Sequence, residues 1–307
     1  MKSSNIGGQA VLEGIMMKNG SKYAVAVRKP DGNIEVKVEE ENGKLKGKIW
    51  RKIPFVRGVF NFIDSLVLGM KTLSYSASFF EEETDKILTE EEARKQKKKE
   101  DLITAITMVV SLIIAMSLFM LLPYFLSELF QQFISHSFLR AVLEAVIRFL
   151  IFMIYILAVS RMKDIRRTFM YHGAEHKCIN CIEHGMELTV ENVRISSKQH
   201  KRCGTSFLFF VMVVSILVCF FITVDVLALR IVLRIALLPL IAGISYEIIR
   251  LAGRSENWFV NLLSKPGLAL QGLTTKEPDD DMIEVGIQAV EAVFDWRAYL
   301  EENFGEQ

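Results

Sequence analysis

Histidines and cysteines, the side chains that bind transition metals most readily, gather in one part of the sequence. Three of the four cysteines and the histidines His172, His176 and His200 lie between residues 172 and 203. Imidazole and thiolate are borderline and soft ligands, a combination that suits zinc and other divalent transition metals. The sequence therefore predicts a metal site, with zinc as the favoured ion.

The first part of this window has the spacing His172-x-x-Glu175-His176, which is typical of inverted zincins. In that motif both histidines bind zinc and the glutamate activates a water molecule. Residues four apart share one face of a helix, so the two imidazoles can converge on one ion while Glu175 holds a water beside it. The helix must tolerate Gly173 between the ligands. This spacing predicts an open, catalytic site with Glu175 as general base.

The second part of the window indicates a different site. Cys178-x2-Cys181 and His200-x2-Cys203 are separated by eighteen residues, a spacing typical of a structural zinc ribbon that catalyses nothing. Zinc commonly takes four ligands, so the two patterns cannot both bind one ion in full. A mixed site, with Glu175 beside the metal, would take its ligands from both patterns: His172, His176, Cys203 and either Cys181 or His200. These spacings leave the catalytic and the structural site as alternatives.

The composition indicates a protein that lies partly in a membrane and partly in the cytosol. Apolar residues make up 51% of the chain and the mean hydropathy is +0.28, which is high for a soluble domain and modest for a transporter. The formal net charge is only +1, so no overall positive field marks a nucleic-acid binder. Roughly the first hundred residues lack the apolar core of a signal peptide, so we expect the N-terminal region to stay in the cytosol.

Four apolar segments predict transmembrane helices, since about 20 residues are needed to cross a bilayer. They are residues 102–127, 139–160, 205–224 and 226–249. Lysines and arginines concentrate before the first segment and between the second and the third, so the positive-inside rule places both regions in the cytosol. Both termini and the histidine–cysteine window then face the cytosol, where reducing conditions favour thiol ligands over disulfides.

The rest of the chain predicts a small cytosolic α+β unit beside this α-helical membrane part. Residues 1–55 suit a β-rich N-terminal unit. A hairpin is predicted there, because residues 23–28 and 34–38 alternate apolar and polar side chains on either side of a strong turn signal, Lys29-Pro30-Asp31-Gly32-Asn33. The glycines between residues 7 and 14 suit either a surface turn or close approach of the backbone to another element. Residues 56–80 predict an amphipathic helix that lies on the membrane or packs against the spans, and residues 81–101 predict a charged arm.

The division of the remaining chain follows from the predicted spans. Transmembrane helices occupy 102–160 and 205–249, and the metal-ligand loop occupies 161–204. Residues 250–307 form a cytosolic tail, in which we expect a docking helix from about 282 to 301. Three aspartates precede that helix, where negative charge favours the positive end of the helix dipole.

Several longer motifs resemble one known family. They include Gly7-Gly8-Gln9-Ala10-Val11-Leu12-Glu13-Gly14, Pro54-Phe55-Val56-Arg57-Gly58, His172-Gly173-Ala174-Glu175-His176-Lys177, His200-Lys201-Arg202-Cys203-Gly204-Thr205 and Pro266-Gly267-Leu268. Through them, nearly the whole chain is similar to the YqhQ family, multi-pass bacterial cell-membrane proteins of uncharacterised function that are described as predicted metal-dependent enzymes. The resemblance implies membership of this family but supplies no substrate.

The resemblance also bears on the ligands. The residues that match the family motifs are His172, Glu175, His176, Cys181, His200 and Cys203. Cys178 falls where the family is expected to carry a hydroxyl or aliphatic residue, which favours the mixed site. The resemblance adds Gln9, Glu13 and Glu247 as further ligands or supporting groups. A salt bridge with Arg250, Arg254 or the basic loop is the alternative role of Glu247.

Two functions of different classes follow from these observations. The first is a membrane-anchored metal-dependent hydrolase, peptidase-like, that acts at the cytoplasmic face with Glu175 as general base. The second is a docking or biogenesis factor that catalyses nothing, whose cytosolic unit is held by a structural metal and binds protein partners. The lipid bilayer is a partner in both, and neither involves specific nucleic-acid binding.

Overall fold

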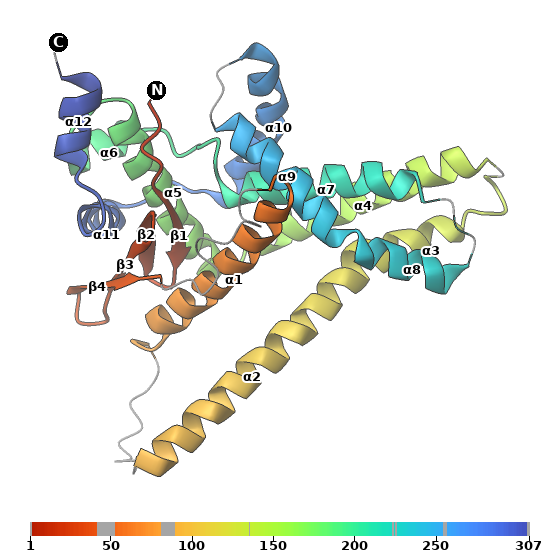
Figure 1. The fold of residues 1–307 in the computed structure, drawn as a ribbon, viewed down its shortest axis with the longest axis horizontal. Coiled ribbons are helices and arrows are strands. Elements are labelled where there is room, and N and C mark those ends of the chain that lie inside the picture. The colour runs from red at the N-terminus through yellow and green to blue at the C-terminus, as the bar shows by residue number, and fades with distance from the viewer. Residues whose placement is uncertain are drawn as a thin grey trace. The chain divides into compact units, whose positions relative to one another are not determined.

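The chain divides into two compact units. The structure is a computed structural model that describes residues 2–41, 53–80, 90–134, 136–222, 224, 226–253 and 257–305. The larger unit contains Met1–Phe80 and Val159–Gln307, and the smaller contains Glu81–Ala158 (Figure 1). Of the charged arm predicted at 81–101, residues 81–89 lie outside the described residues, and the remainder belongs to a helix.

The larger unit contains an antiparallel sheet with the strand order β1-β2-β3-β4. Its strands are β1 (Gly7–Val11), β2 (Gly14–Asn19), β3 (Lys22–Arg28) and β4 (Ile34–Glu40). The predicted hairpin is formed by β3 and β4, with Arg28 opposite Ile34 across a turn in which Gly32 takes a φ of 86°. The glycine-rich segment before it, for which the sequence predicted no strand, supplies β1 and β2.

Helices cover both faces of the sheet. The helices of the larger unit are α1 (Val56–Ala77), α5 (Lys163–Glu183), α6 (Val190–Ile195), α7 (Gly204–Phe220), α8 (Leu227–Ala236), α9 (Leu238–Ala252), α10 (Trp258–Thr274), α11 (Asp280–Glu291) and α12 (Trp296–Phe304). Met16 and Val25 pack with Leu68 of α1 on one face, whereas Ile15 and Ala26 share a core with α5 and α11 on the other (Figure 1). Because successive strand residues point to opposite faces, Tyr23–Val27 is buried throughout.

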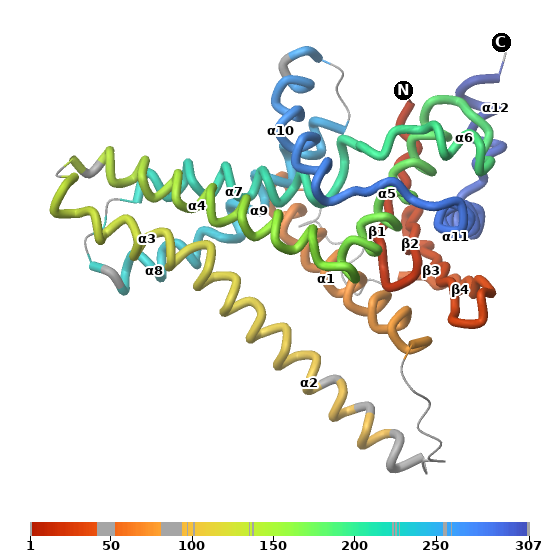
Figure 2. The backbone as a smooth tube through the Cα atoms, turned by 180° about the vertical axis from the view of Figure 1, so that it is seen from behind, coloured from red at the N-terminus to blue at the C-terminus, as the bar shows by residue number. Residues whose placement is uncertain are grey.

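The apolar helices α7, α9 and α10 of the larger unit pack against one another and against α1. Helix α9 packs against both α1 and α7, and α7 also packs against α10 (Figure 2). The smaller unit contains α2 (Glu90–Met116), the π-helix η2 (Ser117–Leu121), α3 (Leu122–Glu128) and α4 (Ser137–Val159).

Among the described residues, three helices are long and apolar enough to cross a membrane. They are Arg94–Glu128, Phe138–Val159 and Ala228–Ala252. The third predicted segment, residues 205–224, forms the shorter helix α7, whose 17 residues end at Phe220. At 1.5 Å per residue this helix is about 26 Å long, less than the hydrocarbon core of about 30 Å. Length and composition therefore support three full-length candidate spans.

The C-terminal region differs from the single docking helix expected at 282–301. That region forms two helices, because the chain turns after α11 and the Asp295 carboxylate accepts a hydrogen bond of 3.0 Å from the Ala298 N–H to begin α12. Ile283 and Val290 of α11 are buried in the core that lies against the sheet. Helix α10, which lies in the predicted tail where no helix was expected, continues through Pro266.

Candidate metal centre

Helix α5 carries two of the candidate ligands and the carboxylate between them, so the predicted helical arrangement of this segment is confirmed. Its second half is buried by packing against the sheet and α11. Gly173 lies where another segment crosses, since a Cβ added there would lie 2.0 Å from the Lys276 carbonyl oxygen. The Lys276 N–H donates to the Phe169 carbonyl at 2.9 Å, which holds the crossing segment on α5. Gly173 is therefore required by packing, at a small cost in helix propensity.

His172, His176 and Cys203 form a compact cluster. One ligand atom from each residue lies within 4.8 Å of the others. The Cys203 Sγ is 3.2 Å from the His172 Nε2, and the two imidazole centroids are 4.4 Å apart. Cys203 is also the N-cap of α7, where its Sγ accepts the Thr205 N–H at 3.3 Å. The structure thus brings ligands from both ends of the window together.

The second nitrogen of each imidazole faces a backbone carbonyl group. The His172 Nδ1 lies 3.0 Å from the Thr274 oxygen, and the His176 Nδ1 lies 2.7 Å from the Lys198 oxygen. A carbonyl oxygen only accepts hydrogen bonds, so each Nδ1 carries the proton and donates it. Each Nε2 is then left with its lone pair. Metal-binding histidines are commonly oriented by such a hydrogen bond from the other ring nitrogen.

This donor set fits a zinc-type ion. Two imidazole nitrogens and one thiolate would supply three ligands, and catalytic zinc sites use three protein ligands and keep the fourth position for water or substrate. Within the described ranges, no further histidine, cysteine, aspartate or glutamate joins the group at the 4.8 Å distance. The residues fit an open site better than a closed one.

Glu175 lies beside the cluster. Its Oε2 is 3.9 Å from the His172 Nε2, and the side chain is 6% exposed. Burial raises the pKa of Glu175, against the lowering effects of His172 and of a hydrogen bond from the Gly8 backbone. A carboxylate that binds a proton more readily than in water is suited to general base catalysis.

Strand β1 approaches this carboxylate at Gly8. A Cβ added at Gly8 would lie 2.9 Å from the Glu175 Cγ and 2.6 Å from the Met16 oxygen. Any side chain there would displace the carboxylate or the strand. The close-approach role considered for the N-terminal glycines therefore applies to Gly8.

The cluster faces a cavity of about 580 Å³. His172, Glu175 and Cys203 line it together with Gly8–Ala10 of β1. The rest of the wall is mainly apolar and comes from α1, α5, α7 and α9: Phe62, Phe169, Phe207, Leu208 and Ile249. A reactant in this cavity would contact His172 and Cys203 of the cluster together with Glu175.

Buried polar side chains hold the loop that leads to Cys203. The Asn180 Nδ2 donates to the carbonyl oxygens of Ser197 and Gln199, at 2.6 and 2.9 Å. Gln271, which is fully buried, accepts the His200 N–H at 3.0 Å and donates to the His200 carbonyl at 2.8 Å. The loop is thereby fixed from α5 on one side and from α10 on the other.

His200 belongs to a different network. Its Nδ1 accepts the Arg202 N–H at 3.4 Å, so its Nε2 carries the proton and donates to Glu183 at 3.2 Å. Burial lowers the pKa of His200, despite the opposing effect of Glu183. Burial alone would raise the pKa of Glu183, but the hydrogen bond from His200 and the charge of Arg202 hold it below its ordinary value. With both ring nitrogens engaged, His200 is neutral and has no lone pair free for a metal.

The other two cysteines of the window lie in the apolar core. The Cys181 Sγ donates to the Glu187 carbonyl at 3.2 Å, and burial raises its pKa to about 11. Cys178 packs at the crossing of α5 and α11, where a Cβ added at Gly286 would lie 2.8 Å from its Sγ, and burial raises its pKa too. Both stay protonated thiols, and the structure does not bring the four ribbon residues together.

The three additional candidates lie apart from the cluster. Gln9 lines the cavity, and its amide packs against Gly69 of α1, where an added Cβ would lie 2.6 Å away. Glu13 has a positive φ of 49° in the β1–β2 turn and pairs with Arg167 of α5. The Tyr171 hydroxyl donates to the same carboxylate at 3.2 Å. These contacts attach the turn, and with it β1, to the metal-site helix.

Glu247 of α9 is engaged by arginines. Its Oε1 accepts from the Arg57 Nε at 2.6 Å, and its Oε2 lies 3.8 Å from Arg250. The Arg250 pairing is the alternative that the sequence offered, whereas Arg57 comes from a motif to which no role was assigned. The pair joins α9 to the start of α1.

Sequence reasoning did not identify the buried polar residues that support the site, namely Lys177, Asn180, Glu183 and Gln271. Lys177, Asn180 and Glu183 recur at intervals of three on α5, which places them on neighbouring faces of the helix. This regular spacing of polar residues was the sequence feature that could have indicated a buried polar network. For Gln271 the sequence carried no signal that separates it from a surface glutamine.

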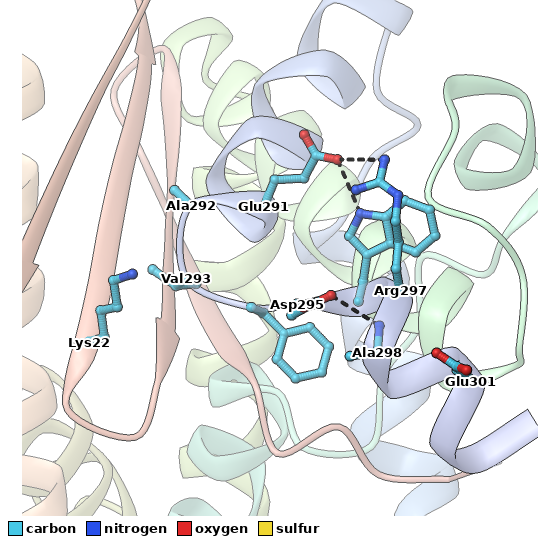
Figure 3. A pocket seen from close by; sticks show the side chains of 10 residues that line it. Lys22, Glu291, Ala292, Val293, Asp295, Arg297, Ala298 and Glu301 are labelled. Carbon is cyan, nitrogen blue, oxygen red and sulfur yellow. Dashed lines mark hydrogen bonds and ion pairs between the residues drawn. The ribbon is translucent and has the colours of Figure 1, made fainter.

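A second hollow lies at the turn between α11 and α12 (Figure 3). Its volume is about 650 Å³, and it lies beside Lys22 of the sheet. Glu291 accepts the Trp296 Nε1–H at 3.1 Å and lies 3.7 Å from Arg297, as the dashed lines show (Figure 3). These groups satisfy one another, and the one candidate ligand cluster found among the described residues lies elsewhere, at the smaller cavity beside His172 and Cys203.

Comparison with known proteins places the chain among uncharacterised relatives. A family model described as "Protein of unknown function (DUF1385)" matches residues 53–296. The "Uncharacterized protein YqhQ" of Bacillus subtilis (strain 168) is 36% identical over 300 residues, which cover 97% of this chain and 94% of the relative. No solved structure matches significantly. These similarities assign no activity, so the function must be argued from the geometry.

Proposed function

The chain belongs to the YqhQ family, and from its own site we propose that it is a membrane-anchored metal-dependent hydrolase. The observation that carries this proposal is the position of the cluster. Two of the three metal-ligand side chains, His172 and Cys203, line one cavity together with the buried carboxylate of Glu175, and the cluster holds no fourth protein ligand among the described residues. Catalytic zinc sites have this ligand count, whereas structural sites are closed by four.

Each residue has a defined part in the proposed mechanism. His172 and His176 would hold the metal through Nε2, and Cys203 would hold it through Sγ. When bound, a zinc-type ion polarises a carbonyl group and lowers the pKa of water. Glu175 accepts a proton from the attacking water and returns it to the leaving group. The apolar cavity wall limits competing water around these groups.

The proposal places this chemistry at the cytoplasmic face of a bacterial cell membrane. Three candidate spans support a multi-pass protein, and the basic segments around residues 95–99 and 161–202 support a cytosolic position for the site. The cavity is lined by α7 and α9, the two apolar helices that leave the sheet unit. Reactants in this cavity are therefore within reach of the bilayer surface.

The test compares the wild-type protein with Glu175→Gln in detergent, using a panel of quenched peptides and acyl esters. We expect the variant to keep its metal and to lose at least about 100-fold in turnover, because general base catalysis contributes a factor of this order or more. Glu284→Gln, which changes an exposed carboxylate on α11, is the matched control. Equal turnover by wild type and Glu175→Gln would contradict the proposal. A metal-loaded wild type that hydrolyses no member of the panel would favour the docking function.

A further inference from the structure

The free edge of the sheet lies in the same cavity as the metal cluster. Strand β1 is the first in sheet order, so one of its edges pairs with β2 and the other pairs with no described strand. Gly8, Gln9 and Ala10 of β1 line the cavity with His172 and Glu175. An unpaired edge of this kind presents N–H and C=O groups that can pair with another extended chain.

The hairpin geometry determines which groups of β1 face this edge. Val11 and Gly14 lie opposite each other across a two-residue turn, and such a closing pair exchanges hydrogen bonds. Alternation along the ladder then assigns Gln9 to bonds with β2 and turns the N–H and C=O of Gly8 and Ala10 outward. Leu12, which shares their alternation, donates its N–H to the Ser76 Oγ of α1 at 3.1 Å, in agreement with this assignment.

Ala10 lies between two points where the edge is already engaged. On one side Gly8 packs against the Glu175 side chain, and on the other the Leu12 N–H donates to the Ser76 Oγ of α1. The outward N–H and C=O of Ala10 lie between these points, at a residue that lines the cavity. This leaves a donor and an acceptor next to the proposed general base.

The character of the wall narrows the choice of occupant. Aromatic and aliphatic side chains of α1, α7 and α9, namely Phe62, Phe207, Leu208 and Ile249, would accommodate apolar side chains or an acyl chain equally. An acyl chain has no use for a backbone donor and acceptor, whereas an extended peptide pairs with both. The edge strand therefore favours a polypeptide.

We propose that the site takes an extended polypeptide segment with apolar side chains, which pairs with Ala10 at the free edge of β1. The paired segment presents an adjacent peptide bond to Glu175 and the metal cluster. Water adds to the carbonyl carbon and the C–N bond breaks. The proton that Glu175 takes from water passes to the leaving amine, so the products are a carboxylate and an amine. The cleavage step rests on the proposed hydrolase function, but the binding step does not.

The experiment measures binding to full-length Glu175→Gln protein in detergent by fluorescence anisotropy. The probe is a fluorescein-labelled peptide of about ten residues with a core of valine, leucine and alanine flanked by lysines. Two matched peptides carry N-methyl groups on alternate core amides, one on each edge of the extended chain, so they keep every side chain. A fluorescent phosphatidylethanolamine is the lipid probe.

We expect one of the two N-methylated peptides to bind at least about fivefold more weakly than the parent. A net hydrogen bond contributes about 0.5–1.5 kcal/mol, which corresponds to roughly 2- to 12-fold for each bond lost. In a second arm, Ala10→Pro removes the outward N–H and spares the bonds between β1 and β2, because proline is tolerated at an edge strand. This variant should weaken binding of the parent peptide by a similar factor, with unfolding followed as a check on the fold.

The outcomes separate this inference from the hydrolase proposal. Equal binding of the parent and both N-methylated peptides would overturn pairing with the β1 edge, whatever the fate of Ala10→Pro. Saturable binding of the lipid probe without binding of the peptide would overturn it in favour of a lipid. Edge-dependent peptide binding without cleavage by the wild type would support this inference and contradict the hydrolase proposal.

Discussion

At the scale of single residues, hydrogen-bond partners decide which histidines are available to a metal. His172 and His176 donate hydrogen bonds from Nδ1 to carbonyl groups, so the Nε2 lone pair of each can face a metal ion. His200 uses both of its nitrogens within the protein. The sequence predicted the H-x-x-E-H pair and Cys203 from spacing, but spacing could not separate His200 from them. That distinction depends on Arg202 and Glu183, which the fold brings to His200.

The Glu183 network makes a prediction about acid stability. Folding lowers the pKa of His200 below 6.5, the ordinary value of histidine, and the pKa of Glu183 below 4.5. As the pH falls below each ordinary value, the unfolded chain therefore binds a proton before the folded protein does. The unfolded state thus binds more protons, so stability falls as the pH falls through these values. Glu183→Gln should lower the free energy of unfolding at pH 7 by about 3 kcal/mol and flatten the loss below pH 4.5.

Denaturant unfolding followed by the fluorescence of Trp296, which lies in the buried core, measures both effects. Glu284→Gln is again the control, because Glu284 is half exposed and its pair with Arg28 contributes at most about 1 kcal/mol. A Glu183→Gln curve that runs parallel to the wild type from pH 7 to pH 3 would show that the network does not link folding to pH.

At the scale of elements, the strands β1 and β2 depend on glycines that allow close packing, which the local sequence pattern did not reveal. The β3–β4 hairpin was predicted because its turn sequence is strong, whereas β1 and β2 were missed because their glycines resemble a loop. Gly8 is needed for the approach to Glu175, and Gly14 lies against the Ala26 carbonyl oxygen, 2.3 Å from an added Cβ. Glycine inside a strand often marks such a close approach. Sequence periodicity alone does not show which residue packs against each glycine.

The crossing at Gly173 predicts opposite effects of the same substitution at two sites. Gly173→Ala should destabilise the protein by about 1–3 kcal/mol, because its Cβ would overlap the Lys276 carbonyl oxygen. Gly272→Ala in α10, where an added Cβ meets nothing within 4 Å, should be neutral or stabilise by up to about 1 kcal/mol. Gly173→Ala should also lower the metal content, since it shifts α5 between its two histidines.

Thermal unfolding in detergent and metal analysis of the same two samples check this prediction. A Gly173→Ala protein that melts above the wild type would show that helix propensity outweighs the crossing. Equal metal content in both variants would show that metal binding does not depend on the packing of α5 at Gly173.

At the scale of the whole molecule, the protein combines long apolar helices with a buried polar site. This combination agrees with an apolar content that is high for a soluble domain and modest for a transporter. Length and hydropathy sufficed to predict the three full-length candidate spans. They overestimated the segment at 205–224, because α7 ends at Phe220, four residues before the predicted end. For the tail the sequence predicted one helix, whereas the structure forms α10, α11 and α12 there.

The proposed membrane topology predicts which surfaces a membrane-impermeant maleimide reaches in intact cells. Gln132→Cys, in the exposed turn after α3, should be labelled from outside. Glu301→Cys, exposed on α12, should be labelled only after permeabilisation. Labelling above the wild-type background is the readout, because the native cysteines are buried or partly buried. Labelling of Glu301→Cys in intact cells would reverse the proposed orientation.

Elemental mass spectrometry of the purified protein tests most directly whether His172, His176 and Cys203 hold one metal ion. The comparison is between wild type, Cys203→Ser and the matched control Cys181→Ser, whose thiol lies in the core outside the cluster. Near-stoichiometric zinc in wild type and Cys181→Ser, with little in Cys203→Ser, is the predicted result. Well-folded wild type without metal when prepared free of chelators, or Cys203→Ser that retains it in full, would contradict the account.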